Sequence, residues 1–108
     1  QEFCVYSDRL RTAGRCDLLA DWNGVPSIID FKGSDKEKRL EWIDGYIKQE
    51  CSYALCVYEM RKMLIPQLVT IIVNEESPLP QIFVEKTSDW MSETVKIFKD
   101  FHRQYPEY

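Results

Sequence analysis

The chain has 108 residues, of which 44% are apolar and 13% aromatic, enough to enclose one hydrophobic core. No apolar run approaches the roughly 20 residues of a membrane-spanning helix, and the N-terminus lacks a signal-peptide pattern, which argues against a membrane protein or a secreted one. The formal net charge of −4 does not predict the basic surface of many nucleic-acid-binding proteins, although bound divalent cations can compensate an acidic site.

The cysteine pattern bears on the cellular compartment. The spacings match no zinc-binding motif, and a single histidine accompanies the cysteines. We therefore expect small buried side chains in a reducing, intracellular compartment (the cytoplasm of a host or an organelle matrix), and favour this over disulfides or a metal site. The four residues are Cys4, Cys16, Cys51 and Cys56.

The first third of the chain is predicted to form strands. Residues 2–7 and 11–22 are strand-like, and the dipeptide Asn23-Gly24 follows them. This dipeptide is a strong signal for a two-residue type I′ hairpin turn, because both residues tolerate positive φ. Residues 25–32 are predicted to form the returning strand.

A helix is predicted after a polar connection at 33–39. From about Leu40 to Met63, apolar residues recur at three- and four-residue steps, which is the helical period, and Pro66 helps to end the helix. The stripe consists of Leu40, Ile43, Ile47, Ala54 and Val57.

The last third is predicted to contain two strands and a second helix. Residues 67–74 form the first strand and residues 81–86 the second, with Ser88 or Asp89 capping the helix. The apolar stripe of that helix is expected to be Met91, Val95, Phe98 and Phe101 or His102. The predicted order is β-β-β-α-β-β-α, a single α/β (α+β) domain spanning 1–108.

The predicted hairpin brings two carboxylates together. If Asn23 and Gly24 are the loop, Trp22 faces Val25, and the same antiparallel register sets Asp17 directly opposite Asp30. Their Cβ atoms would then be ~4.5–5.5 Å apart, where like charges repel. A divalent cation is a natural compensation, because hard cations take carboxylate oxygen ligands.

Strand alternation adds a lysine to this pair. Asp30 and Lys32 are two residues apart and share a face, whereas Ile29 and Phe31 are expected to point into the core. Two carboxylates holding one or two Mg²⁺ ions, with a lysine that orients water or stabilises charge, suit phosphodiester hydrolysis. A surface ion pair on a strand would also produce an Asp-X-Lys pattern, so this alternative stays open.

The predicted helix places Gln49 and Tyr53 four residues apart on one face, with Tyr46 on roughly the same side. Taken alone, this pattern also fits an ordinary amphipathic helix.

Three ordered motifs resemble the PD-(D/E)XK nuclease superfamily, and specifically its RecB-like exonuclease branch. They are G-x-x-D at 14–17, D-x-K at 30–32 and Q-x-x-x-Y at 49–53. The nearest resemblance is to small phage and viral exonucleases and to the mitochondrial genome-maintenance exonucleases. It implies a restriction-endonuclease-like core, with a mixed central sheet flanked by helices.

The resemblance also implies roles for individual residues. Asp17, Asp30 and the backbone carbonyl of Phe31 would bind Mg²⁺, which Mn²⁺ can replace, and Lys32 would be the catalytic lysine. The DNA-positioning residues would be Gln49 and Tyr53. Glu2 falls near the place where some members carry an extra acid.

Two departures from the family pattern stand out. Family members often carry a ligand on a helix before the first strand, and no such helix is predicted in this chain. The small hydroxyl residue that often follows the lysine is replaced by Gly33, and Ser34, the next residue, could substitute for it in positioning DNA.

A run of basic residues after the D-x-K motif, Lys36, Lys38 and Arg39, could contact DNA phosphates or form a solvated loop. The function expected from all these features is a Mg²⁺-dependent DNA exonuclease acting on free or single-stranded ends, in which a metal-activated water attacks the phosphodiester. The alternatives are a catalytically weak nuclease fold that serves in nucleic-acid binding or assembly, and a structure-specific endonuclease. A homo-oligomer or a protein partner is a further expectation.

Overall fold

The computed structural model describes residues 3–36 and 38–107, which contain six strands and two long helices. The strands are β1 (Phe3–Ser7), β2 (Thr12–Cys16), β3 (Leu18–Trp22), β4 (Val25–Ser34), β5 (Gln67–Asn74) and β6 (Gln81–Lys86). The helices are α1 (Asp44–Arg61) and α2 (Thr87–Gln104), with a 3₁₀ turn at Leu40–Trp42 before α1.

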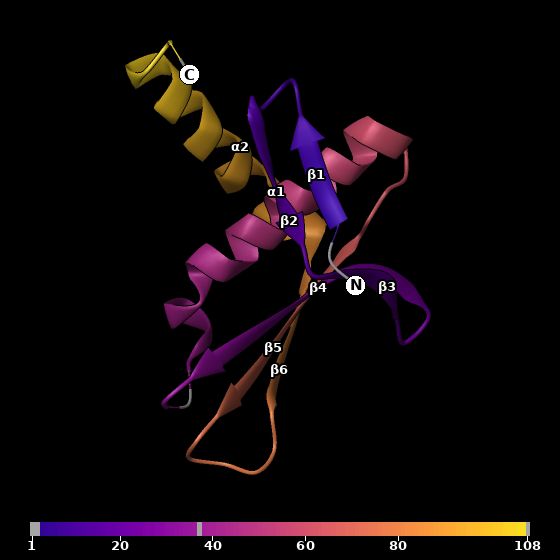
Figure 1. Ribbon diagram of the computed structural model, residues 1–108, viewed down its shortest axis with the longest axis vertical. Coiled ribbons are helices and arrows are strands. Elements are labelled where there is room, and N and C mark those ends of the chain that lie inside the picture. Colours follow the sequence, from indigo (N-terminus) through magenta and orange to yellow (C-terminus); the bar gives the residue numbers. More distant parts are fainter. Residues whose placement is uncertain (1–2, 37, 108) are drawn as a thin grey trace.

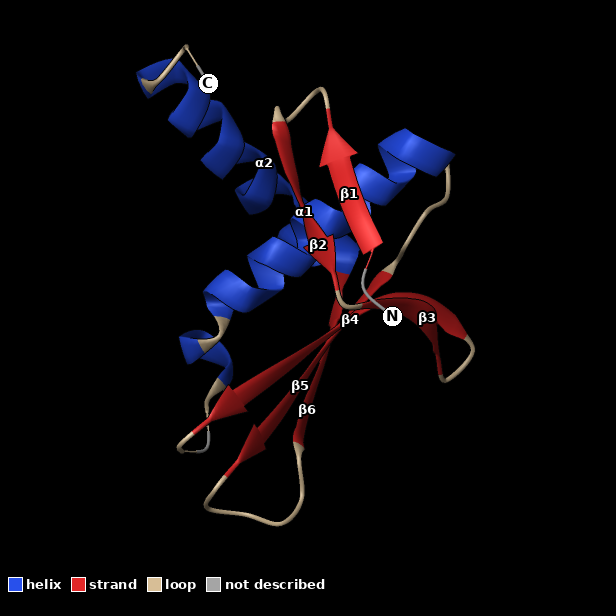
Figure 2. Ribbon diagram, viewed as in Figure 1, coloured by secondary structure: helices blue, strands red, loops and turns tan. Residues whose placement is uncertain are grey.

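The larger sheet has the strand order β3-β4-β5-β6 (Figure 2). Its central strands β4 and β5 are parallel, and the two outer pairs are antiparallel. Parallel neighbours need a long crossover connection, and α1 supplies it. The expected mixed sheet in an α/β protein is therefore confirmed at this level.

The stretch predicted as one strand over 11–22 is two strands, so the order is β-β-β-β-α-β-β-α. The chain bends at Asp17: β2 before the bend pairs with β1 in a separate two-stranded sheet, and β3 after it pairs with β4. Both segments have strand-like composition and a single residue separates them, so the sequence pattern alone did not reveal the bend.

Helix α1 packs between the two sheets and contributes more residues to the core than any other element. It contacts the β1–β2 hairpin as well as β4 and β5, and it crosses behind the hairpin in Figure 1. The predicted residues Ile43, Ile47, Ala54 and Val57 are all buried there. The helix thus holds the hairpin against the sheet.

The start of the first helix differs from the prediction. Leu40 belongs to the 3₁₀ turn and is 39% exposed, and the helix begins only at Asp44. The helix ends at Arg61, where Lys62 adopts the left-handed conformation at φ 55° and its N–H donates to the Tyr58 carbonyl. This left-handed C-terminal residue stops the helix before Pro66.

The second helix has a different buried stripe from the predicted one. It begins at Thr87, with no side-chain cap from Ser88 or Asp89. Thr87 and Thr94 are buried, and Trp90 packs against the core. The predicted contacts Met91 and Phe101 are exposed instead, because threonine hydroxyls bond to backbone carbonyls and let α2 approach with its threonine face.

The two faces of the larger sheet have different surroundings. Ile28, on the face shared with Asp30 and Lys32, belongs to the core that α1 covers. Phe31, on the other face, was predicted to enter the core but is 52% exposed. Strand alternation shows which residues share a face but not which face a helix will cover.

All four cysteines are free. Cys16, Cys51 and Cys56 are buried as expected, but Cys4 is exposed, because it alternates with the inward-facing Val5 on the outer strand β1. In the part of the chain that the structure describes, neither helix combines the length and apolarity needed to cross a membrane.

Candidate functional site

The hairpin register places Asp17 and Asp30 together. Strands β3 and β4 pair from Trp22 opposite Val25 to Leu18 opposite Ile29, as the two-residue turn predicted. Asp17 lies directly before β3, next to the Leu18–Ile29 pair, and its Oδ2 accepts the backbone N–H of Phe31 at 3.1 Å. At the bend, the side-chain carboxylate of Asp17, and not a backbone carbonyl, is therefore the acceptor for the Phe31 N–H of β4.

Lys32 joins the pair from the same face of β4. Its Nζ lies 3.0 Å from Oδ2 of Asp30 and 5.0 Å from the centre of the Tyr46 ring on α1. Burial lowers the pKa of Lys32, but the ion pair with Asp30 and the negative charges nearby outweigh it and raise the pKa overall. Lys32 is thus held as a cation with a fixed position.

The two aspartates have opposite pKa shifts. Asp30 is only 5% exposed, and burial followed by the neighbouring Asp17 raises its pKa to about 6, despite the opposing effect of Lys32. The interaction with the Asp30 side chain, and then the Phe31 N–H, lowers the pKa of Asp17. Near neutral pH the pair therefore carries adjacent negative charge that one lysine compensates in part.

Glu50 is a buried acid that the motif analysis did not single out. It lies on α1, is fully buried, and accepts a hydrogen bond from the hydroxyl of Thr70, the β5 neighbour of Asp30. Its other carboxylate oxygen, Oε1, has no hydrogen-bond partner within the described residues. Burial raises the pKa of Glu50 to about 9, so it is protonated at neutral pH.

The burial of Glu50 could have been predicted from its position in the sequence. It stands seven residues after Ile43 and three after Ile47, on the apolar stripe of the helix. An acid within such a stripe is buried when the helix packs. The negative charges of Asp30 and Asp17 contribute to its raised pKa, which places it beside the site.

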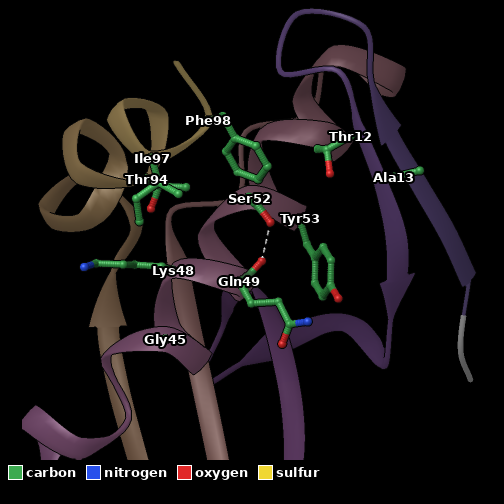
Figure 3. Close-up of a pocket in the computed structure, with 10 residues that line it drawn as sticks. All are labelled: Thr12, Ala13, Gly45, Lys48, Gln49, Ser52, Tyr53, Thr94, Ile97 and Phe98. Atoms are coloured by element: carbon green, nitrogen blue, oxygen red, sulfur yellow. Dashed lines mark hydrogen bonds between the residues drawn. The ribbon is translucent and has the colours of Figure 1, made fainter. Parts of the chain in front are cut away.

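Gln49 and Tyr53 line a cavity next to this cluster, as their shared helical face suggested (Figure 3). The ring of Tyr53 packs against Gly14 of β2, where an added Cβ would lie 2.8 Å from Cε1 of the ring. The glycine of the G-x-x-D motif therefore leaves room for the tyrosine of the Q-x-x-x-Y motif. Sequence reasoning alone had not linked these two positions.

The remaining predicted residues lie at the end of β4 and beyond it. The Ser34 hydroxyl donates to the carbonyl of Lys36 and accepts its N–H, so it closes a turn. Gln81 of β6 fastens the loop by hydrogen bonds to the N–H and carbonyl of Lys38, both at 2.8 Å. Lys36 and Arg39 are exposed, and Glu2 lies outside the described residues.

The oxygen donors of the cluster fit a small divalent cation. Within residues 3–36 and 38–107, no three histidine, cysteine, aspartate or glutamate side chains are grouped so as to hold a metal ion. Mg²⁺, however, commonly uses one or two carboxylates and completes its shell with water. The facing carboxylates of Asp17 and Asp30 provide such a pair. The carbonyl of Phe31 points to the same side of β4 as its N–H, toward Asp17.

Comparisons with known proteins add no assignment. No protein-family model matches this sequence, and no curated protein is significantly similar to it.

Proposed function

We propose that the chain is a Mg²⁺-dependent DNA nuclease of the PD-(D/E)XK superfamily, RecB-like branch, acting on free single-stranded ends. The observation that carries the proposal is the junction at Asp17. The bend there brings one carboxylate against the N–H of Phe31, beside a second carboxylate whose ion pair fixes a lysine. A strand ion pair alone would need neither the bend nor the second acid.

In this proposal Asp17 and Asp30 hold the cation, together with the carbonyl of Phe31. Bound Mg²⁺ would supply a more acidic water and a polarised phosphate. Burial, and then the neighbouring Asp17, raise the pKa of Asp30, and a cation between the carboxylates would relieve their repulsion. Repulsion between two carboxylates in the absence of a cation favours cation binding.

Lys32 stabilises the negative charge that develops on the phosphate oxygens. Its raised pKa keeps it protonated, which suits electrostatic stabilisation and not proton abstraction. The Tyr46 ring on one side and Asp30 on the other restrict the ammonium group, so less reorganisation is needed during reaction. Mn²⁺ is expected to replace Mg²⁺, because it also prefers oxygen ligands.

The test compares linear and circular single-stranded DNA of equal sequence. The purified protein should degrade the linear form with Mg²⁺ or Mn²⁺ and stop when EDTA is added. Asp17→Asn should abolish degradation, because it removes one carboxylate charge at a half-exposed position while keeping its shape. Cleavage of the circle would instead indicate an endonuclease, since a circle has no end.

A second candidate is a nuclease fold that binds nucleic acid without cutting it. The observation in its favour is that the described residues bring two carboxylates, and no third, into metal-binding position. Binding of DNA without cleavage at any Mg²⁺ or Mn²⁺ concentration would establish this function in place of the first.

A further inference from the structure

A cavity of about 340 Å³ opens beside the carboxylate site, between β2, α1 and α2 (Figure 3). This volume is at the small end of the range for ligand pockets, roughly 300–1,000 Å³. The residues that define its walls are Thr12, Gln49, Ser52, Tyr53, Ile97 and Phe98.

The walls combine aromatic surface with neutral hydrogen-bonding groups. Phe98 from α2 and Tyr53 from α1 project into the same space, and the Gln49 amide lies below them (Figure 3). The Ser52 hydroxyl donates to the Gln49 carbonyl at 2.6 Å and keeps oxygen lone pairs as acceptors. Flat rings with hydrogen-bonding edges suit such walls, because bases stack on aromatic side chains.

The charge of the pocket favours a neutral group. Lys48 is the cation among the lining residues, and its Nζ is paired with Asp44 at 2.9 Å. In Figure 3 the Lys48 ammonium points away from Phe98 and Tyr53. A phosphate would find no unpaired cation at these walls, whereas a base needs none.

Tyr53 connects the pocket to the carboxylate site. Burial raises the pKa of its hydroxyl, and the charge of Asp30 raises it further while that of Lys32 opposes the shift. The Tyr53 ring also packs against Gly14 of β2, the strand that leads into Asp17, so this residue borders both the pocket and the carboxylate site. A chain whose phosphate lies at Asp30 and Lys32 could turn an adjoining base into the pocket.

We propose that this pocket receives one unstacked nucleobase of a single-stranded nucleic acid, stacked on Phe98 and bounded by Tyr53 and Gln49. The inference rests on the proposed function, because the neighbouring phosphate site supplies the rest of the ligand. A base in duplex DNA is paired and stacked on both sides, so the pocket selects single strands or frayed ends.

The experiment measures binding apart from cleavage. Fluorescence anisotropy compares a labelled 12-nucleotide single strand with an abasic strand of equal length, in Ca²⁺, with strand integrity checked on a gel. The whole chain should bind the base-containing strand roughly fivefold or more tightly. Phe98→Leu, which keeps apolar volume and removes the ring, should bring this ratio close to one.

The matched control is Phe101→Leu, on the same helix but exposed and outside the pocket. It should keep the wild-type ratio, and thermal unfolding should show that both variants fold. Equal wild-type affinity for the two strands, or an unchanged ratio in Phe98→Leu, would overturn the proposal.

Cleavage in Mg²⁺, measured on the same proteins, separates the two proposals. Base-dependent binding without cleavage would support the proposed base pocket and contradict the proposed nuclease function. Cleavage together with binding that does not depend on bases would support the proposed nuclease function and contradict the proposed base pocket.

Discussion

The two faces of strand β4 show how differently one strand can be used. On the face covered by α1, charged groups are buried: Asp30 is 5% exposed and paired with Lys32, and Glu50 approaches from the helix. On the opposite face Ile29 is buried, but toward the end of the strands Phe31 is 52% and Val73 of β5 is 62% exposed. At this end of the sheet, ionisable groups are therefore buried on one face while apolar side chains on the other face contact water.

This contrast between the two faces separates positions that affect function from positions that affect neither function nor stability strongly. Burying ionisable groups costs free energy unless they are paired or neutralised, and here the pKa values of both Asp30 and Glu50 are raised. Perturbed groups gathered in one place are typical of functional sites. We therefore expect substitutions on the covered face to change activity and pH dependence, and those on the open face to change little.

The largest effect is expected at Lys32. Lys32→Met should lower the rate of DNA degradation by roughly 100- to 1,000-fold, because it removes the cation that stabilises developing charge. The matched control, Lys99→Met, changes an exposed lysine of α2 and should leave the rate nearly unchanged. Equal losses in the two variants, measured by release of nucleotides, would remove the distinction between the site and the remaining surface.

The next effect concerns pH. Because the pKa of Glu50 is raised from 4.5 to about 9, the folded protein binds a proton that the unfolded chain releases, and stability falls as pH rises through this window. The fall is at most about 1.4 kcal/mol per pH unit. Glu50→Gln keeps the shape without a titrating group, so its free energy of unfolding should depend less on pH.

The comparison is best made between about pH 6.5 and about pH 8.5, because Asp30, with a pKa of about 6, has largely titrated below this interval. Urea unfolding of both proteins at each pH measures the slopes. Parallel slopes would show that Glu50 is already ionised in the folded state.

A smaller effect is expected from filling the space at Gly14. Gly14→Ala sets a Cβ 2.8 Å from the Tyr53 ring and should lower the free energy of unfolding by about 1–3 kcal/mol. Gly33→Ala, on the open face of β4, meets no atom within 4 Å and should change stability by less than about 0.5 kcal/mol.

Tyr53→Ala provides the check on this mechanism. In that background Gly14→Ala should cost much less, because the ring that it meets is gone. An undiminished cost in the double variant would place the strain elsewhere.

The smallest effect is expected on the open face. Val73→Thr keeps the shape of an exposed side chain and should change the free energy of unfolding by less than about 0.5 kcal/mol. Ile72→Val, at the fully buried neighbour, should cost about 0.5–1.5 kcal/mol. A larger loss for Val73→Thr would reveal that this face is covered in solution.

The sequence predicted the pairing of Asp17 with Asp30 because a two-residue turn leaves one register for the strands that it joins. It also predicted the strand at 67–74, from a nearly continuous apolar run, and most of the buried residues of α1, from the apolar residues at helical spacing and the cysteines. The bend at Asp17 was missed, since strand-like residues continue on both sides of it.

The choice of covered face was missed for a related reason. Alternation tells that Asp30 and Lys32 share a face, but the position of α1 decides which face is buried, and that is a long-range property. Glu50 was passed over because a charged residue was not counted within an apolar stripe. The contact between Gly14 and Tyr53 joins two elements far apart in the sequence, so no local pattern encodes it.

Cation binding between the two carboxylates is the central claim, and a crystal soaked in Mn²⁺ tests it most directly. Anomalous scattering should show one strong peak between Asp17 and Asp30, with the carbonyl of Phe31 as a third protein ligand. The peak should vanish in Asp17→Asn crystals. An intact site without Mn²⁺ density between these carboxylates would contradict the claim.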